Sequence, residues 1–412
     1  MSKKAVLIGC NYPGTNAALN GCINDVWGMK AMLEQYYGFD PANIFIMIDT
    51  DPQYMRPDGK NMKVAKISEL VTNAVDGDVL VLHFSGHGTQ IPSQGEAGET
   101  DGKDEAICPT DLNVICDDDL RVLIKPLEAK PGVKFTFIAD CCHSGSLLDH
   151  EAVQISGPKA GGPPPPQLDE GTLAGFLGSL GQPNGGRDFQ NRALPFNDLC
   201  SMLSSLLGGQ AVNASNVRST LGTAFGADAS AKIQQFMQVY QMFANGGLTN
   251  AGGGGGGGGL MAMLCSCFSP PAAADQNGPS GQPANATTGP GANYATGNLA
   301  EPNLNIQLPP AGAKPPAEQR LNKDVGILIT GCQSNETSAD ACPSGNPAKA
   351  HGALSNAMQT IVKQHHAANP GVPLSYRNLV IAVRELLLKT GFAQNPCLEC
   401  SNLHADEPFI VR

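Results

Sequence analysis

Short apolar runs alternate with amphipathic segments over the first 150 residues of the chain. Residues 18–37 repeat an apolar side chain every three to four positions, which is the period of a helix with one buried face, and residues 64–74 do the same. Apolar strands separated by such helices are typical of a parallel sheet covered on both faces. The runs that predict strands are residues 5–9, 44–48, 79–84 and 135–139.

This alternation breaks down after residue 150. Residues 161–166 are two glycines followed by four prolines, and residues 252–259 are an unbroken glycine run. Residues 269–318 are rich in proline, glycine, alanine and asparagine, a composition that predicts a flexible segment. Within this insert, only residues 194–207 and 215–244 have a partly helical pattern.

The alternation returns near residue 324, with a predicted strand at 325–330 and helices at 353–362 and 376–388. This last part is too short to bury its own core, so we expect it to complete the first sheet. The sequence therefore predicts a catalytic region at 1–150, an insert at 151–322 and a closing region at 323–412.

Composition and charge exclude several classes of protein. The formal net charge of −11 disfavours nucleic-acid binding, which would need a basic surface. No apolar stretch approaches the roughly 18 residues that span a bilayer, so no membrane contact is expected. A strand-length apolar run directly follows Met1 to Lys4, which is too short for a signal peptide, so we expect a cytoplasmic protein. The 13 cysteines are then expected to be free thiols, although the sequence leaves a Cys332–Cys342 disulfide open.

Two motifs carry the candidate chemistry, HFSGHG at 83–88 and DCCHSG at 140–145, and each ends a predicted buried strand. The carboxyl ends of neighbouring parallel strands meet in one crevice, where a histidine could activate a thiol. Cys142 follows His87 by 55 residues (142 − 87), close to the roughly 50 of caspases. We choose Cys142 over Cys141 as the nucleophile, although alternation along the strand would allow either. The backbone N–H groups of Gly88 and Cys142 are the natural donors to an oxyanion.

Carboxylates gather near these motifs. Asp140 ends a buried strand and needs a partner to offset its desolvation, and Asp25 lies in the first predicted helix. Together they could bind an arginine or lysine side chain. A separate loop, residues 99–119, is rich in acidic residues that either are solvated or bind a cation such as calcium. It does not follow the EF-hand pattern, and its acidic members include Asp101, Asp104, Glu105, Asp111, Asp117, Asp118 and Asp119.

Several blocks together resemble the metacaspases, in particular the type II class: HFSGHG, DEAICPTD, ICDDDL, DCCHSG and GILITGCQSNETSADA. The resemblance covers residues 4–150 and 323–411, with weaker similarity around 192–237. It implies a caspase-like fold, with a mostly parallel central sheet, helices on both faces and a long flexible insert. Residues 1–150 would correspond to the large subunit and 323–412 to the small subunit.

The same resemblance implies roles for individual residues. His87 would be the base and Cys142 the nucleophile of a cysteine endopeptidase that cleaves proteins after Arg or Lys. The implied substrate pocket is lined by Cys22, Asp25, Ser85 and Asp140. Calcium would activate the enzyme, and the implied ligands are Asp104, Asp117, Asp118 and Asp149.

The family resemblance also implies a zymogen that cuts its own insert after a basic residue. The candidates are Arg187, Arg192, Arg218 and Lys232, and we prefer Arg218 because residues 215–232 most resemble the self-cleaved segment of the family. The protein is expected to act as a monomer. The alternative is a caspase-fold scaffold that binds partners through its insert; intact His87 and Cys142 favour the enzyme.

Overall fold

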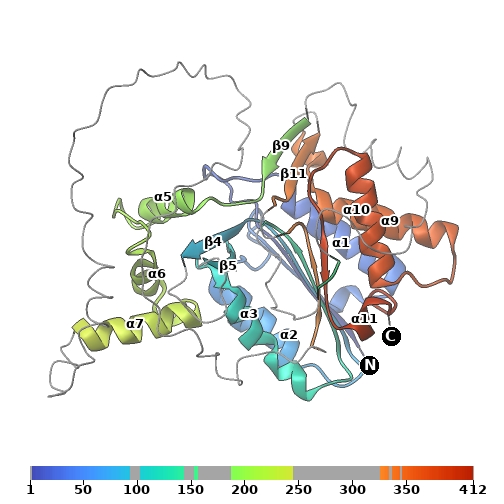
Figure 1. The fold of residues 1–412 in the computed structure, drawn as a ribbon, viewed down its shortest axis with the longest axis horizontal. Coiled ribbons are helices and arrows are strands. Elements are labelled where there is room, and N and C mark those ends of the chain that lie inside the picture. The colour runs from blue at the N-terminus through green and yellow to red at the C-terminus, as the bar shows by residue number, and fades with distance from the viewer. Residues whose placement is uncertain are drawn as a thin grey trace. The chain divides into compact units, whose positions relative to one another are not determined.

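The computed structural model describes residues 2–92, 103–142, 153–155, 187–244, 325–333, 336–343 and 346–411. Its centre is a seven-stranded sheet in the order β2-β1-β3-β7-β10-β13-β8 (Figure 1). The first five of these strands are parallel, and β13 runs antiparallel to both of its neighbours, β10 and the edge strand β8. The strands are β1 (Lys3–Gly9), β2 (Ile44–Ile48), β3 (Val79–Ser85), β7 (Lys134–Asp140), β8 (Val153–Ile155), β10 (Ile327–Thr330) and β13 (Cys397–Glu399).

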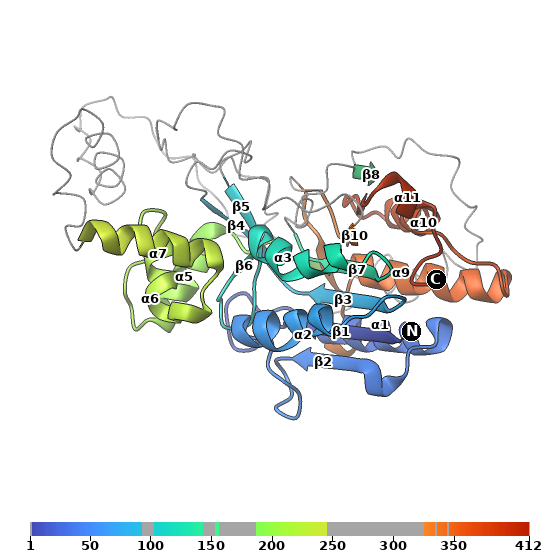
Figure 2. The ribbon, with the colours of Figure 1, turned by 90° about the horizontal axis from the view of Figure 1, so that it is seen from below.

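Helices cover both faces of this sheet, because its strands carry apolar side chains on both sides. One apolar cluster joins alternate residues such as Leu7 and Val81 to helices α1, α9 and α10, and a second joins Ile8 and Leu82 to α2 and α3. Figure 2 shows α2 and α3 apart from the α9 and α10 pair. The bounds are α1 (Cys22–Tyr37), α2 (Ser68–Thr72), α3 (Asp117–Ile124), α9 (Ala353–Ala368), α10 (Tyr376–Lys389) and α11 (Asn402–Ala405), with a π-helical turn Asn61–Ile67 before α2.

Local sequence signals begin and end these helices. Helix α10 begins after Ser375, whose hydroxyl oxygen accepts the backbone N–H of Asn378. Helix α1 ends at Gly38, which adopts the left-handed conformation with φ of 63° that glycine takes without strain. Short 3₁₀ turns occupy Pro41–Asn43, Lys125–Ala129, Gly226–Asp228 and Pro347–Lys349.

Two small sheets lie beyond the main one. The first contains β4 (Gly88–Pro92), β5 (Lys103–Ile107) and β6 (Ile115–Cys116), and the second contains β9 (Arg187–Asn191), β11 (Ala339–Pro343) and β12 (His351–Gly352). Strand β9 comes from the insert and pairs antiparallel with β11 from the closing region. The insert thereby joins the last part of the chain through backbone hydrogen bonds.

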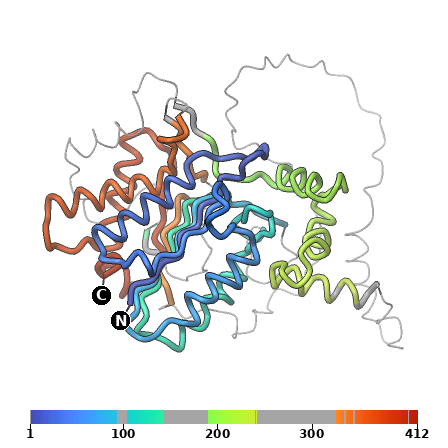
Figure 3. The backbone as a smooth tube through the Cα atoms, turned by 180° about the vertical axis from the view of Figure 1, so that it is seen from behind, coloured from blue at the N-terminus to red at the C-terminus, as the bar shows by residue number. Residues whose placement is uncertain are grey.

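The predicted fold class is confirmed, since a mostly parallel sheet carries helices on both faces. Figure 3 traces the N-terminal strands in blue beside the later strands in teal and orange. The closing region supplies β10 and β13 of the same sheet. Within the insert, the two predicted helical stretches form α5 (Phe196–Leu206), α6 (Val217–Phe225) and α7 (Ala231–Ala244). Among the described residues, no helix has the length and apolarity needed to cross a bilayer.

Candidate active site

The two sequence motifs meet at the carboxyl ends of β3 and β7, as predicted. Ser85 and Asp140 are register partners at the ends of these strands, and His87 and Cys142 follow two residues later. Gly88 passes so close to the second motif that a Cβ built there would lie 1.7 Å from the carbonyl oxygen of Cys142. Only glycine fits this position, because any side chain would overlap the backbone that carries the thiol.

His87 is oriented by a backbone carbonyl and a tyrosine. Its Nε2 lies 2.7 Å from the carbonyl oxygen of Ala17, which can only accept, so Nε2 carries the proton. Its Nδ1 has no hydrogen-bond partner among the described residues. The centroid of the Tyr12 ring lies 4.8 Å from that of the His87 ring, with the two planes tilted by 35°, and the Tyr12 hydroxyl oxygen accepts the His87 backbone N–H. Burial lowers the pKa of His87, which favours a neutral ring able to accept a proton at Nδ1.

The thiol of Cys142 is held by two other segments of the chain. Its Sγ accepts the backbone N–H of Ser338 at 2.8 Å and donates to Oδ1 of Asn191 at 3.2 Å. The adjacent Cys141 belongs to the apolar cluster on the other side. This arrangement agrees with the choice of Cys142 over Cys141. Cys332 and Cys342, the pair left open by the sequence, are not joined by a disulfide.

A buried arginine of the insert lies between the carboxylates of the predicted pocket. The guanidinium of Arg192 contacts Asp25 at 2.8 Å, Asp340 at 2.8 Å and Asp140 at 3.3 Å. It also donates to the hydroxyl oxygen of Ser85 at 2.7 Å. Arg192 is 0% exposed, so these side chains form a closed, negatively charged receptor for one guanidinium.

The walls of this pocket are shaped by small residues and by Cys22. A Cβ at Gly352 would lie 2.2 Å from Oδ2 of Asp140, and the Gly352 backbone N–H donates to the carboxylate of Asp25. The Cys22 side chain is buried against the same charges. Burial, partly offset by Arg192, raises the pKa of Asp25 to about 6. The structure therefore brings all four predicted pocket residues together.

The backbone around Arg192 also has defined partners. Its carbonyl oxygen accepts the N–H of Gly88 at 3.0 Å, and its own N–H donates to the carbonyl oxygen of Ser338 at 3.0 Å. Gly88, predicted as an oxyanion donor, thus points at the carbonyl of the residue whose side chain fills the pocket. The same role for the Cys142 N–H stays a prediction.

Sequence reasoning missed several residues of this site. Asp340 is the third carboxylate on Arg192, and its other hydrogen bonds come from the backbone N–H groups of Asn20 and Gly21. The other missed residues are Tyr12, which contacts His87, and Asn191 and Ser338, which contact the Cys142 thiol. Asp340 lies in the block GILITGCQSNETSADA, already singled out by its resemblance, which was the available signal. Arg218, the preferred self-cleavage site, lies on Asp104, and the arginine in the pocket is Arg192.

The acidic loop binds cationic side chains of the insert. A carboxylate oxygen of Asp104 lies 2.7 Å from Nζ of Lys232. Asp104 also pairs with Arg218, and the Arg218 guanidinium donates to the carbonyl oxygen of Pro92. Lys232 bridges to Asp118 at 2.8 Å. Of the other predicted ligands, Asp117 lies 3.6 Å from Arg121, and Asp149 lies outside the described residues.

These carboxylates suit a hard cation in their chemistry, because an ammonium group already bridges two of them. The described part of the chain contains no group of three or more histidine, cysteine or acidic side chains arranged to hold a metal ion. Carboxylate oxygens are the type of ligand that calcium prefers, and here Asp104 and Asp118 are paired with basic side chains of the insert.

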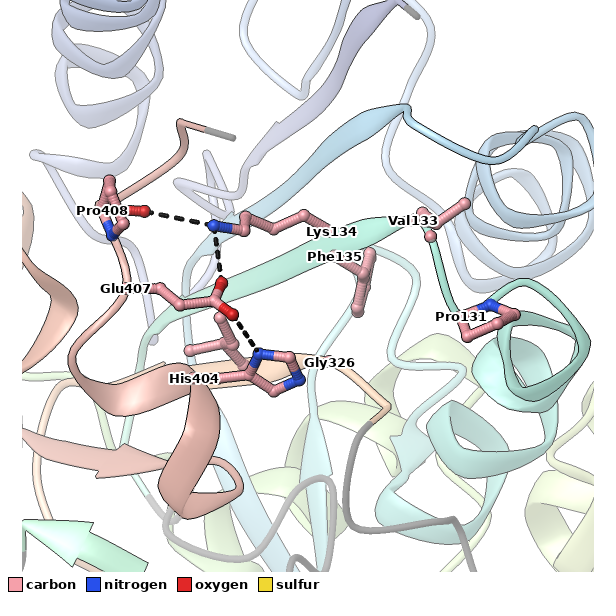
Figure 4. A pocket seen from close by; sticks show the side chains of 10 residues that line it. Pro131, Val133, Lys134, Phe135, Gly326, His404, Glu407 and Pro408 are labelled. Atoms are coloured by element: carbon pink, nitrogen blue, oxygen red, sulfur yellow. Dashed lines mark hydrogen bonds and ion pairs between the residues drawn. The ribbon is translucent and has the colours of Figure 1, made fainter.

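A separate hollow of about 250 Å³ lies at the other end of the sheet, where β7 begins (Figure 4). Its polar side chains form a chain of contacts: Lys134 lies 2.7 Å from Glu407, which in turn lies 3.1 Å from His404. Lys134 also donates to the carbonyl oxygen of Val411. These contacts fasten the C-terminal segment to β7 and contribute nothing to the crevice around Cys142.

Comparisons with known proteins agree with this geometry. Residues 3–151 match the family model described as "Metacaspase, peptidase C14 domain". Over the full length of both chains, the sequence is 35% identical to Metacaspase-4 and to Metacaspase-6 of Arabidopsis thaliana. It is also 42% identical to Metacaspase-1 of Emericella nidulans over 36% of this chain and 37% of that protein. With His87 and Cys142 assembled at one sheet edge, the chain belongs to the metacaspases, a family of cysteine peptidases.

Proposed function

We propose that this metacaspase is a calcium-dependent endopeptidase that cleaves proteins after Arg or Lys and is made as a zymogen. The observation that carries the proposal is Arg192, which is bound with its guanidinium among three carboxylates and its carbonyl oxygen on the Gly88 N–H. This is the position expected for the residue before a scissile bond. The assembled pair of His87 and Cys142 favours the enzyme over the scaffold alternative.

The chemistry follows from the placement of the pair. The thiol of Cys142 loses its proton to Nδ1 of His87, which burial keeps neutral. The thiolate attacks the substrate carbonyl carbon, and the Gly88 N–H stabilises the oxyanion. His87 then returns the proton to the leaving amine, which leaves a thioester on Cys142. Water hydrolyses the thioester with His87 again acting as the base.

Specificity would come from the three carboxylates around the pocket. An arginine fits because its planar guanidinium can pair with several carboxylate oxygens at once, and lysine could bind as a point charge. An acidic or neutral side chain would leave Asp25, Asp140 and Asp340 buried without a cation, which is strongly unfavourable. We also propose that the enzyme acts as a monomer.

Latency would come from the insert, because a substrate arginine cannot enter while Arg192 is bound. We propose the bond between Arg192 and Ala193 as a site of self-cleavage, because the Arg192 carbonyl oxygen accepts the Gly88 N–H. Arg218 stays a second predicted site. In the docked insert it is 5% exposed on Asp104, so its cleavage requires α6 to move first.

Calcium dependence would involve the acidic loop, with Asp104, Asp117 and Asp118 as ligands together with Asp149. Bound calcium would supply the positive charge that these carboxylates need once the insert has left. Asp104 and Asp118 cannot pair with Lys232 and bind a metal ion at the same time. We therefore expect the docked insert and calcium to exclude each other.

Peptide reporters test the proposal directly. Purified protein is incubated with otherwise identical fluorogenic peptides ending in Arg, Lys, Asp or Gln, each with excess calcium or with a chelator. We expect hydrolysis of the Arg and Lys peptides only, and only with calcium. Cleavage after Asp would contradict the specificity, and full activity in chelator would contradict the calcium dependence.

A further inference from the structure

The insert continues through the active site beyond Arg192, and the residues that follow are bound as specifically as those that precede it. Before the arginine, β9 pairs antiparallel with β11. After it, the Leu194 N–H donates to the carbonyl oxygen of Gly88 at 2.8 Å. The Thr89 hydroxyl donates to the carbonyl oxygen of Leu194, also at 2.8 Å. Both sides of the Arg192–Ala193 bond are therefore held by main-chain recognition.

The side chain of Leu194 is part of this binding. It is 2% exposed and belongs to the apolar cluster that includes Ile91 on β4 and Ile107 on β5. By contrast, Ala193 between Arg192 and Leu194 is only half-buried. Alternation along an extended chain explains this difference, because neighbouring side chains point to opposite sides. The second residue after the bond thus faces the protein interior.

Strand β4 provides the surface for this contact. Gly88 forms a parallel bridge with Ala193, and β5 occupies the other edge of β4. A peptide that adds to an exposed strand edge gains affinity from main-chain hydrogen bonds and specificity from alternate side chains. Gly88 serves both sides of the bond, since its N–H contacts the Arg192 carbonyl and its carbonyl accepts from Leu194.

We propose that this peptidase has a second specificity site, which accepts an apolar residue two positions after the cleaved bond. Gly88 and Thr89 bind the backbone of that residue, and the apolar cluster around β4 and β5 binds its side chain. Thr89 is therefore a positioning residue, because it binds the backbone of the residue whose side chain enters the apolar cluster. The inference rests on the proposed cleavage after arginine, and the substrate class becomes extended peptides with an Arg and an apolar residue separated by one small residue.

The test uses internally quenched peptides taken from the chain itself. Their sequence is Asp-Phe-Gln-Asn-Arg-Ala-X-Pro, with X as Leu, Ala or Asp, and the enzyme is full-length protein after activation. A matched reporter ends at the arginine and carries only a fluorescent leaving group. We expect kcat/KM to fall about tenfold from Leu to Ala and further to Asp, because a buried apolar site discriminates by this order.

A variant then locates the site. Thr89→Val keeps the shape of the side chain and removes the donor, so we expect it to lower the ratio of kcat/KM on the Leu peptide to that on the reporter. Thr110→Val, which removes a hydroxyl bound to Asp49, should leave this ratio unchanged. Equal kcat/KM for the three peptides, with the reporter still cleaved, would overturn the second site and leave the proposed function standing. Failure to cleave any peptide or reporter would overturn both.

Discussion

The carbonyl oxygen of Arg192 lies 3.0 Å from the backbone nitrogen of Gly88, so the insert presents its own peptide bond to the predicted oxyanion donor. The segment is bound in the manner proposed for a substrate, with the Arg192 side chain among the carboxylates and the backbone of the segment on β4 and β11. Asn191, the preceding residue, accepts the Cys142 thiol hydrogen. The same segment that places the bond therefore also competes with His87 for the thiol proton.

Substitution of the two adjacent cysteines should separate their roles. Cys142→Ala removes the nucleophile, and we expect kcat on an arginine reporter to fall by at least about 10³-fold. Cys141→Ala removes a buried core group instead, and we expect activity to persist with a modest loss of stability. The measurement is reporter hydrolysis, with thermal unfolding to compare folding. Retained activity in Cys142→Ala would refute the assignment.

Removal of the internal arginine should abolish latency. Arg192→Gln takes the guanidinium away from Asp25, Asp140 and Asp340, so the pocket is open to reporters before any cleavage. It also leaves three buried carboxylates without a cation, and we expect unfolding to become easier by about 3–5 kcal/mol.

Reporter hydrolysis by the uncut chain and urea denaturation measure the two effects of Arg192→Gln. Arg192→Lys is the matched control, because it keeps one positive charge and should remain more latent and more stable. An uncut Arg192→Gln protein as inactive as the wild type would show that another contact blocks the site.

The ion pairs on the acidic loop should oppose calcium binding. Lys232→Met, made in a Cys142→Ala background to prevent cleavage, removes the ammonium group that bridges Asp104 and Asp118, while Arg218 stays paired with Asp104. We expect calcium to bind at least several-fold more tightly by equilibrium dialysis, and α7 to exchange its amide hydrogens faster.

Lys60→Met is the matched control, because Lys60 is 62% exposed and pairs only at the surface, with Asp228. It should change neither measurement. Calcium affinity that stays the same in Lys232→Met would contradict the competition between the insert and the metal.

Stability should fall in mild acid because of a histidine away from the catalytic pair. Burial lowers the pKa of His83 to about 4, against about 6.5 in an unfolded chain. The unfolded state therefore binds more protons than the folded state between pH 6.5 and pH 4. The contribution of the neutral His83 ring to the free energy of unfolding is complete above pH 6.5 and is lost as the pH falls toward 4. The integrated effect is about 3 kcal/mol.

His83→Gln should reduce this loss, since glutamine can still contact Ser355, the partner of Nε2, and does not titrate. Urea unfolding at pH 7 and pH 4.5 gives the comparison. His351, whose pKa burial also lowers to about 4, should keep part of the effect in place. The partly exposed His365→Gln is the control, and an equal acid loss in His83→Gln and wild type would count against this explanation.

The parts of the fold that were predictable are those with strong local patterns. The strands at residues 44–48 and 79–84 were evident because buried parallel strands need unbroken apolar runs. Strand β4, with Gly88, Thr89 and Gln90, carries no such run, and its pairing with β5 depends on contacts between segments. The antiparallel β13 is three residues long and was hidden for the same reason.

In the candidate site too, the predictable residues are those that follow strong local patterns. His87, Cys142 and Asp140 follow predicted strands, so their meeting could be inferred from chain order alone. The choice between Arg192 and Arg218 could not, because both are arginines in the insert and only tertiary pairing decides which carboxylates each one reaches. Arg192 follows a strand that pairs with β11, whereas Arg218 lies on a helix beside Asp104. Asp340 was missed because its role depends on two distant segments.

The antiparallel pairing of β9 with β11 has a kinetic consequence. Arg192 is tethered a few bonds from the strand that aligns it, so it faces its pocket at an effective concentration on the order of millimolar. A free protein substrate at micromolar concentration competes poorly with such a tethered group. Cleavage of the proposed 192–193 bond would leave Arg192 joined to β9, so the pocket would open to free substrates only when β9 separates from β11.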